Sequence, residues 1–187
     1  MKIIHTAAET EEYIKKSRFI GVIKPCQTEA EALQSIKALH LLHPAASHIV
    51  YAYRVQSPQG LVCRFNDAGE PSGTAGKPVF QHLEGKQLLN VLVAVIRYYG
   101  GVKLGAGGLT RAYSNLAKQA IDCVELVEYV EYCELQLTVA YNRLQALEYQ
   151  LQKLDGCILA QEFAEQVGVK IKIPKHNSEL LMSFIAA

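Results

Sequence analysis

The sequence predicts an α+β protein with two domains, and three observations support this prediction. At 187 residues the chain suits one large or two small domains, and half of its residues are hydrophobic. Patterns typical of strands and patterns typical of helices both occur along it. The acidic stretch VELVEYVEYCE, from Val124 to Glu134, separates two parts of different character. We therefore expect a first domain at 1–124 and a second at 131–187.

The first domain opens with a predicted strand at 13–25, in which Phe19 to Ile23 are mostly apolar. The sequence Thr28-Glu29-Ala30-Glu31 fits a capping box, where a hydroxyl and a carboxylate satisfy free N–H groups at a helix start. Residues 48–55 and 61–65 then predict two strands, because each is apolar and short. The Ser-Pro-Gln-Gly sequence between them is typical of a hairpin loop.

A polar loop follows, Asn66 to Pro78, which has three glycines and two prolines and so fits no regular element. One interpretation makes it a binding loop that presents N–H groups and hydroxyls. The other makes it a crossover loop whose own Asp, Ser and Thr cap its turns. Its candidate binding residues are Asp67, Glu70, Ser72, Thr74 and Lys77.

The segment Arg97 to Tyr113, RYYGGVKLGAGGLTRAY, connects a predicted buried strand at 88–98 to a predicted helix from about Gly108 to Cys123. A short helix at 77–83 precedes this strand. Strand, glycine-rich turn and helix start form an arrangement in which backbone N–H groups and the helix dipole hold an anion. The candidate phosphate or RNA contacts are Lys77, Arg97, Lys103, Gly105, Gly107, Gly108, Arg111 and Lys118.

Charge is unevenly distributed along the chain, although the net charge is only +1. Residues 1–70 carry +1, residues 71–121 carry +5 and residues 122–187 carry −5. A basic middle segment that contains the glycine-rich turn indicates an anionic partner, such as phosphate or nucleic acid. The alternative is that these charges are scattered over the surface.

The second domain is predicted to contain a one-sided strand at 133–139, a helix with a leucine seam from Leu144 to Leu154, and strands at 157–163 and 167–173. A further helix is expected after Pro174. The order β-α-β-β-α lacks only a final strand to be ferredoxin-like. We expect either a truncated chain or another segment at that sheet edge.

Several classes of protein are excluded by composition. Five cysteines without a CxxC pair favour reduced thiols in a cytoplasmic protein over a disulfide framework. The apolar runs are too short to span a membrane, and the N-terminus lacks a signal-peptide pattern. His40, His43 and His48 invite a metal interpretation, but their spacing lacks a clear third ligand, which favours surface or capping histidines. No metal or cofactor is expected.

Four motifs together resemble the IMPACT/YigZ family: KSRF at 16–19, HPAASHIVYAYR at 43–54, GEPSGTAGKP at 69–78 and RYYGGVKLGAGGLTRAY at 97–113. The resemblance runs in order through about the first 120 residues and is closest to the bacterial members. It implies a first domain of the ribosomal-protein-S5 domain-2 type and a ferredoxin-like second domain. That pair is similar to the last two domains of elongation factor G, and the resemblance places the domain junction at 125–131.

The resemblance also bears on function. Eukaryotic members of the family regulate translation through a protein partner that controls a starvation-responsive kinase, and nucleic-acid or ribosome binding is suggested for bacterial members from their fold. One departure matters, because the family commonly has two adjacent acids where this chain has Asp67 and Ala68. A carboxylate-pair site for Mg²⁺ or acid–base chemistry is therefore weakened.

The leading hypothesis is a non-enzymatic, translation-associated regulator that binds RNA or the ribosome through the basic glycine-rich surface. Tyr98 and Tyr99 are candidates for stacking on bases. The first alternative is a phosphate- or nucleotide-handling enzyme, because small-molecule kinases share the implied fold and LGAGGLT at 104–110 is loosely similar to their phosphate loop. The second is a protein-interaction module whose basic face meets an acidic partner.

Overall fold

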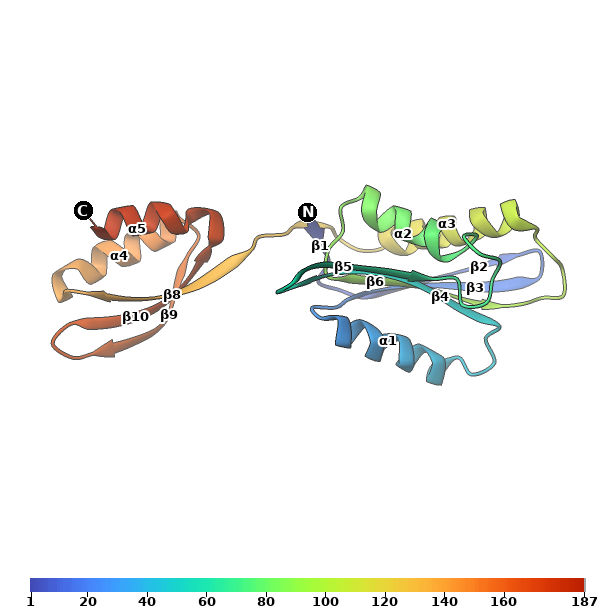
Figure 1. The fold of residues 1–187 in the computed structure, drawn as a ribbon, viewed down its shortest axis with the longest axis horizontal. Helices are drawn as coiled ribbons and strands as arrows, with labels where there is room; N and C mark the ends of the chain where they lie inside the picture. The colour runs from blue at the N-terminus through green and yellow to red at the C-terminus, as the bar shows by residue number, and fades with distance from the viewer. Residues whose placement is uncertain (187) are drawn as a thin grey trace. The chain divides into compact units, whose positions relative to one another are not determined.

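The computed structural model describes residues 1–186 and confirms the mixed α and β composition (Figure 1). Its contacts divide into two compact units, Met1–Tyr129 and Val130–Ala187. The boundary lies after the short strand β7 (Val127–Glu128), which pairs with β1 (Lys2–Ile3) inside the first unit. The first unit therefore includes residues beyond 124.

The N-terminal unit contains a five-stranded antiparallel sheet of order β2-β3-β6-β4-β5. Helix α1 (Glu29–Leu42) covers one face, and α2 (Gly76–Gly85) and α3 (Ala106–Asp122) cover the other (Figure 1). The strands are β2 (Ala8–Ile14), β3 (Ser17–Pro25), β4 (His48–Ser57), β5 (Gly60–Asn66) and β6 (Val91–Tyr98).

The middle strand β6 is buried on both faces, as its continuous apolar run predicts. Val91, Val93 and Val95 belong to the core beneath α2 and α3. The residues between them point to the opposite face, where Ala94 and Ile96 pack with Leu39 of α1. This alternation brings the next residue of β6, position 97, to the α2 and α3 side.

The predicted strand at 13–25 is instead two strands. Lys15 and Lys16, with φ of 45° and 66°, form a tight turn that joins β2 to β3. Strand β2 was missed because its sequence, AETEEYI, is mostly polar and lies at the sheet edge, where half-buried and exposed residues alternate.

The other predicted elements of this unit are confirmed, with helix starts shifted by one or two residues. The backbone N–H of Glu31 donates to the Thr28 hydroxyl at 3.1 Å, and the Glu31 carboxylate accepts from the N–H of Gln27 at 2.8 Å. These are the reciprocal bonds of a capping box, offset by one residue at the carboxylate. The hairpin between β4 and β5 turns where it was expected, between Ser57 and Gly60.

The C-terminal unit contains a three-stranded antiparallel sheet of order β8-β10-β9. Its core lies between the sheet and the helices α4 and α5. Within residues 1–186 no fourth strand joins this sheet, so the edge expected to be filled by another segment is unpaired there. The elements are β8 (Tyr132–Val139), α4 (Tyr141–Lys153), β9 (Cys157–Phe163), β10 (Val167–Pro174), the 3-10 helix η1 (Lys175–Asn177) and α5 (Ser178–Ala186).

Candidate functional site

A cavity of about 440 Å³ lies in the N-terminal unit, where the two glycine-rich loops meet beside the start of α3. One loop connects β5 to α2, and the other connects β6 to α3. The fold therefore brings together two loops that are separated along the sequence by α2 and β6. Residues that line the cavity include His48, Glu70, Arg97, Tyr99, Lys103 and Gly105.

The loop after β6 is held in place by the turn that starts β3. A Cβ atom at Gly100 would overlap the backbone carbonyl of Lys16, so only glycine fits there. The buried hydroxyl of Ser17 accepts hydrogen bonds from the Gly100 N–H at 3.2 Å and from Nη2 of Arg97 at 3.4 Å. The motifs KSRF and RYYGG thus form one local structure.

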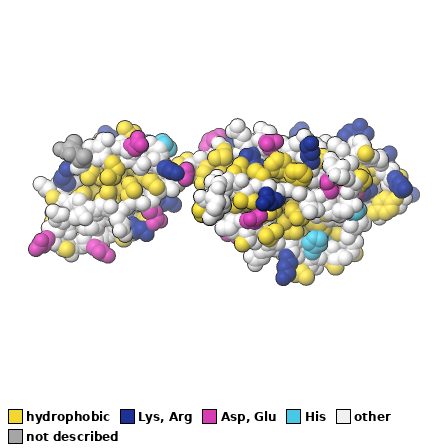
Figure 2. Space-filling model, viewed as in Figure 1, with side chains coloured by type: hydrophobic (Ala, Val, Ile, Leu, Met, Phe, Trp, Pro, Cys, Tyr) yellow, Lys and Arg dark blue, Asp and Glu magenta, His cyan; other side chains and the backbone are white. Residues whose placement is uncertain are grey.

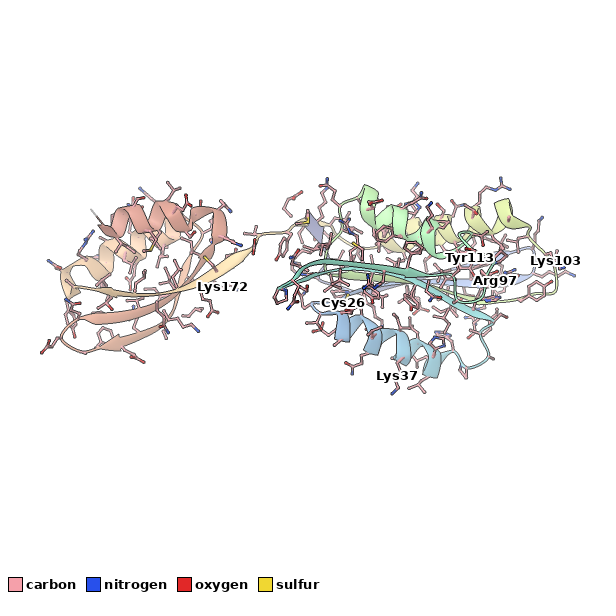
Figure 3. All side chains as sticks on the ribbon, in the orientation of Figure 1. Cys26, Lys37, Arg97, Lys103, Tyr113 and Lys172 are labelled. Atoms are coloured by element: carbon pink, nitrogen blue, oxygen red, sulfur yellow. The ribbon has the colours of Figure 1, made fainter. Side chains whose placement is uncertain are left out.

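Arg97 is only 4% exposed, and its Nη1 donates to Oε1 of Glu70 at 2.6 Å. The Tyr113 hydroxyl donates to the same oxygen at 2.7 Å. Burial, together with this bond to the Glu70 carboxylate, raises the pKa of Tyr113 well above its usual range, so the hydroxyl stays a donor. Figure 3 shows Arg97 and Tyr113 close together beneath α3, with Lys103 farther out.

This placement differs from the expectation for Arg97. As a predicted phosphate contact it was expected to be open, but its charge is balanced inside the protein by Glu70. The physical reason is its position on β6, where an inward-facing side chain on the α2 and α3 side enters the core. Glu70, predicted only as a loop candidate, is also buried, at 8% exposure.

The two adjacent tyrosines have different environments. The Tyr98 ring contacts Arg18, with the guanidinium 5.5 Å from the ring centroid, and its hydroxyl is 2.8 Å from Nδ1 of His43. The Tyr99 ring is 46% exposed and lies over the guanidinium of Arg97, 5.3 Å from its centroid. Of the two predicted stacking residues, only Tyr99 lines the cavity.

His48 lines the cavity, although the sequence suggested it only as a metal ligand and favoured a surface or capping role. Its Nδ1 lies 2.9 Å from the carbonyl oxygen of Ala68, and because a carbonyl only accepts, Nδ1 carries a proton and donates. Its other ring nitrogen, Nε2, lies 3.8 Å from Oε1 of Glu70. The signal was hidden because His48 begins strand β4, whereas both of its partners belong to the loop that follows β5.

The loop from Asn66 to Pro78 caps itself around Asp67. The Asp67 carboxylate accepts from the N–H groups of Gly73 at 2.9 Å, Ala75 at 3.0 Å and Gly76 at 2.7 Å. Burial alone would raise the pKa of Asp67, but these three bonds hold it below its ordinary value.

Other members of the loop vary in exposure. The Thr74 hydroxyl donates to the carbonyl of Pro71 at 2.6 Å, which is a further bond within the loop. Ser72 and Lys77 are exposed. Asp67 and Thr74 therefore fit the self-capping interpretation, whereas Glu70 faces the cavity.

Helix α3 begins at the cavity without a side-chain cap. Its N-cap residue is Gly105, with φ of 76°, a conformation that favours glycine. A Cβ at Gly107 would meet no atom within 4 Å, and one at Gly108 would lie 3.0 Å from Cβ of Leu104. Among these three predicted anion-site glycines, Gly105 is the one that its backbone conformation requires.

The remaining predicted basic contacts lie outside the cavity. Arg111 and Lys118 are exposed on α3, and Lys118 is about 18 Å along the helix from Ala106 at 1.5 Å per residue. Lys118 lies near the C-terminal end of α3, and burial, followed by the charges of Lys86 and Lys118, lowers the pKa of His82. On the face drawn in Figure 2, the Lys and Arg side chains of this unit are spread out and do not form one patch.

Within residues 1–186 no group of three or more His, Cys, Asp or Glu side chains is arranged to hold a metal ion. None of the helices described is both long enough and apolar enough to cross a membrane. All five cysteines are free thiols, and burial raises the pKa of Cys26 to about 12.

Comparisons with known proteins agree with the sequence resemblance. Residues 15–121 match the model of the Impact N-terminal domain. An IMPACT family member of Haemophilus influenzae is 36% identical over 95% of this chain and 87% of its own length. The IMPACT family member YigZ of Escherichia coli K12 is 33% identical over 87% of this chain and 80% of its own. A crystal structure of a hypothetical protein, 30% identical, covers 99% of this chain and 90% of its own with a TM-score of 0.71.

Proposed function

This chain belongs to the IMPACT family, and we propose that it is a non-enzymatic, translation-associated protein that binds RNA or ribosomal phosphates at the mouth of the cavity beside α3. The observation that carries the proposal is the uncapped start of α3, which opens into the cavity next to the exposed Lys103. The first N–H groups of a helix have no partners within it, and the helix dipole is positive there. An anion is therefore favoured at this point.

The two helices that follow the glycine-rich loops differ in a way that supports the proposal. At α2 the carboxylate of Asp67 binds the N–H groups of Ala75 and Gly76, so the chain itself supplies the anion. At α3 no side chain takes that place. A phosphate oxygen from a ligand would make the same kind of bond at Gly105 and Ala106.

Other groups around the cavity fit RNA. The exposed ring of Tyr99 offers a flat surface for a base, and stacking on an aromatic side chain suits single-stranded RNA. Lys77, Arg111 and Lys118 are exposed and would extend phosphate contacts along α2 and α3. These groups position a strand without reading its sequence.

The two alternatives have less support. In a phosphate-handling enzyme a carboxylate would commonly hold Mg²⁺, but Asp67 binds three backbone N–H groups and Glu70 is paired with Arg97. A protein-interaction module would use the same basic residues against an acidic partner. Its binding to ribosomes would not depend on intact RNA.

Co-sedimentation with ribosomes tests the proposal. We expect the full chain to pellet with ribosomes, to be released by a high-salt wash, and to be lost after nuclease treatment. Lys103→Ala should reduce the bound fraction, whereas Lys37→Ala should not, because Lys37 is an exposed lysine on α1 across the sheet (Figure 3). Binding that survives nuclease would favour a protein partner, and no ribosome or RNA binding would contradict the proposal.

A further inference from the structure

The cavity has walls and a floor of different chemistry. Leu104, Leu109 and Pro71 give it apolar walls, and the Tyr99 ring forms another side. Its volume of about 440 Å³ falls within the range of small-molecule sites in proteins. Such sites combine apolar walls with a few polar groups that select the ligand.

The floor presents two hydrogen-bond acceptors. Both bonds to the Glu70 carboxylate, from Arg97 and Tyr113, end on Oε1, and no bond among the described residues reaches Oε2. His48 donates from Nδ1, so in the neutral ring Nε2 is an acceptor. The 3.8 Å between Nε2 and Oε1 of Glu70 is too long for a hydrogen bond. Oε2 of Glu70 and Nε2 of His48 therefore each lack a donor.

Arg97, beneath the floor, also has a donor without a partner. Its Nε is buried and has no hydrogen-bond partner among the residues described. Buried polar atoms without partners are rare and call for an explanation. The guanidinium lies 5.3 Å from the ring centroids of both Phe19 and Tyr99.

We propose that the cavity binds a single nucleotide, with its base against Tyr99 and its phosphate at Lys103 and the first turn of α3. The two floor acceptors, Glu70 and His48, select a base that presents adjacent N–H donors. This inference rests on the proposed function and names the chemical group that the site takes from RNA. The same chemistry is present in a free nucleotide.

Guanine is the base that fits the floor best. Its N1–H and N2–H₂ groups are neighbouring donors, which match the carboxylate of Glu70 and Nε2 of His48. Uracil has one N–H between two carbonyl oxygens, and a carboxylate repels those oxygens. Adenine and cytosine each offer one amino group beside a ring nitrogen that only accepts. The expected order is therefore guanine first and uracil last.

Titration calorimetry of the full chain with the four nucleoside 5′-monophosphates tests this inference. We expect GMP to bind about tenfold or more tightly than UMP, as for a base read by two hydrogen bonds. Guanosine should bind more weakly than GMP, and Lys103→Ala should reduce that difference, because the N–H groups of α3 still bind the phosphate. Lys37→Ala is the matched control and should leave both affinities unchanged.

Substitutions in the cavity separate stacking from base selection. Tyr99→Ala should weaken all four nucleotides by about tenfold, and Tyr99→Phe should retain binding because the ring is kept. Glu70→Gln should remove the preference for GMP. Because Glu70 also balances the buried Arg97, the fold of the Glu70→Gln variant is checked by circular dichroism. His48→Ala provides a second test at a side chain that is 24% exposed. His48→Ala should likewise reduce the GMP preference.

The outcomes distinguish this inference from the proposed function. Equal affinities for the four nucleotides, or affinities insensitive to Tyr99→Ala, would overturn the nucleotide pocket even if ribosomes were bound in a nuclease-sensitive way. Selective GMP binding that is lost in His48→Ala would support it. If that binding occurred without any RNA or ribosome association, the pocket would stand and the proposed function would fall. A short RNA with one unpaired guanosine, compared with GMP, separates an RNA ligand from a free nucleotide.

Discussion

At the scale of single residues, the polar floor of the cavity depends on one buried ion pair. Arg97 is 4% exposed and Glu70 is 8% exposed, so both charges have been removed from water. A buried pair of this kind contributes little net stability while intact, but losing one partner leaves an uncompensated charge. The pair therefore makes the cavity floor sensitive to substitution.

We predict that Glu70→Ala lowers the free energy of unfolding by about 3–5 kcal/mol, because Arg97 is left buried without its partner. Urea unfolding of the wild type and the variant measures the change. Glu11→Ala is a matched control, since Glu11 forms the same kind of pair with Arg18 at 2.8 Å but on the surface. It should change stability little. Equal effects of the two substitutions would contradict the buried-pair account.

Only part of this residue-scale description could be predicted from the sequence. The charge pattern identified Arg97 and the polar loop identified Glu70 as candidates, but nothing local indicated that Arg97 on β6 and Glu70 in the loop after β5 bind each other. The position of His48 beside Glu70 was not predicted for the same reason. A pairing between a strand and a distant loop depends on the sheet order, which sequence periodicity does not reveal.

At the scale of elements, the glycines between β6 and the first turn of α3 have different roles. Gly100→Ala should destabilise the unit by more than about 1 kcal/mol, because the new methyl group would overlap the Lys16 carbonyl and separate the loop from β3. Gly107→Ala should instead stabilise it by about 0.5–1 kcal/mol, because alanine suits a helix and the space is open. Thermal and urea unfolding of both variants measure this. A destabilising Gly107→Ala would contradict the contacts described here.

The Asp67 loop gives a prediction about pH. Because the folded-state pKa of Asp67 is below its ordinary value, its stabilising bonds are fully present above pH of about 4 and are lost as the pH falls through the folded pKa. Asp67→Asn should therefore cost about 1 kcal/mol at pH 7, because both carboxylate oxygens accept bonds and the amide keeps only one acceptor oxygen. The difference from wild type should shrink at pH 3. A constant difference at both pH values would show that the charge of Asp67 is not responsible.

These elements were largely predictable because their signals are local. The capping box of α1, the hairpin between β4 and β5 and the apolar run of β6 each depend on neighbouring residues. Strand β2 was not predictable in that way, because a polar edge strand is recognised only by its pairing with β3. The capping role of Asp67 was one of two open interpretations, and the three N–H groups that it binds lie at the far end of the same loop.

At the scale of the whole molecule, the boundary between the two units can be tested. The backbone N–H of Tyr129 donates to the carbonyl of Met1 at 2.8 Å, and β7 pairs with β1 within the first unit. A fragment of residues 1–129 should therefore be more stable than one of residues 1–124, by about 1–3 kcal/mol for the lost hydrogen bonds and apolar contacts. Urea unfolding of both fragments measures this. Equal stability would support a boundary at 124.

The family was predictable from four motifs between Lys16 and Tyr113, and the comparisons confirm it. The cavity was not predictable, because the motifs of the two glycine-rich loops indicate where ligands are expected but not how the two loops pack together. The physical account of function therefore depends on the uncapped start of α3 beside Lys103.

The most direct test of the central claim is the salt dependence of binding to single-stranded RNA. The logarithm of the association constant should fall linearly with the logarithm of salt concentration, with a slope of about −0.7 for each phosphate neutralised. Lys103→Ala should make the slope less steep by about 0.7, and Lys37→Ala should leave it unchanged. Absence of RNA binding, or a slope that Lys103→Ala and Lys37→Ala affect equally, would contradict phosphate binding beside α3.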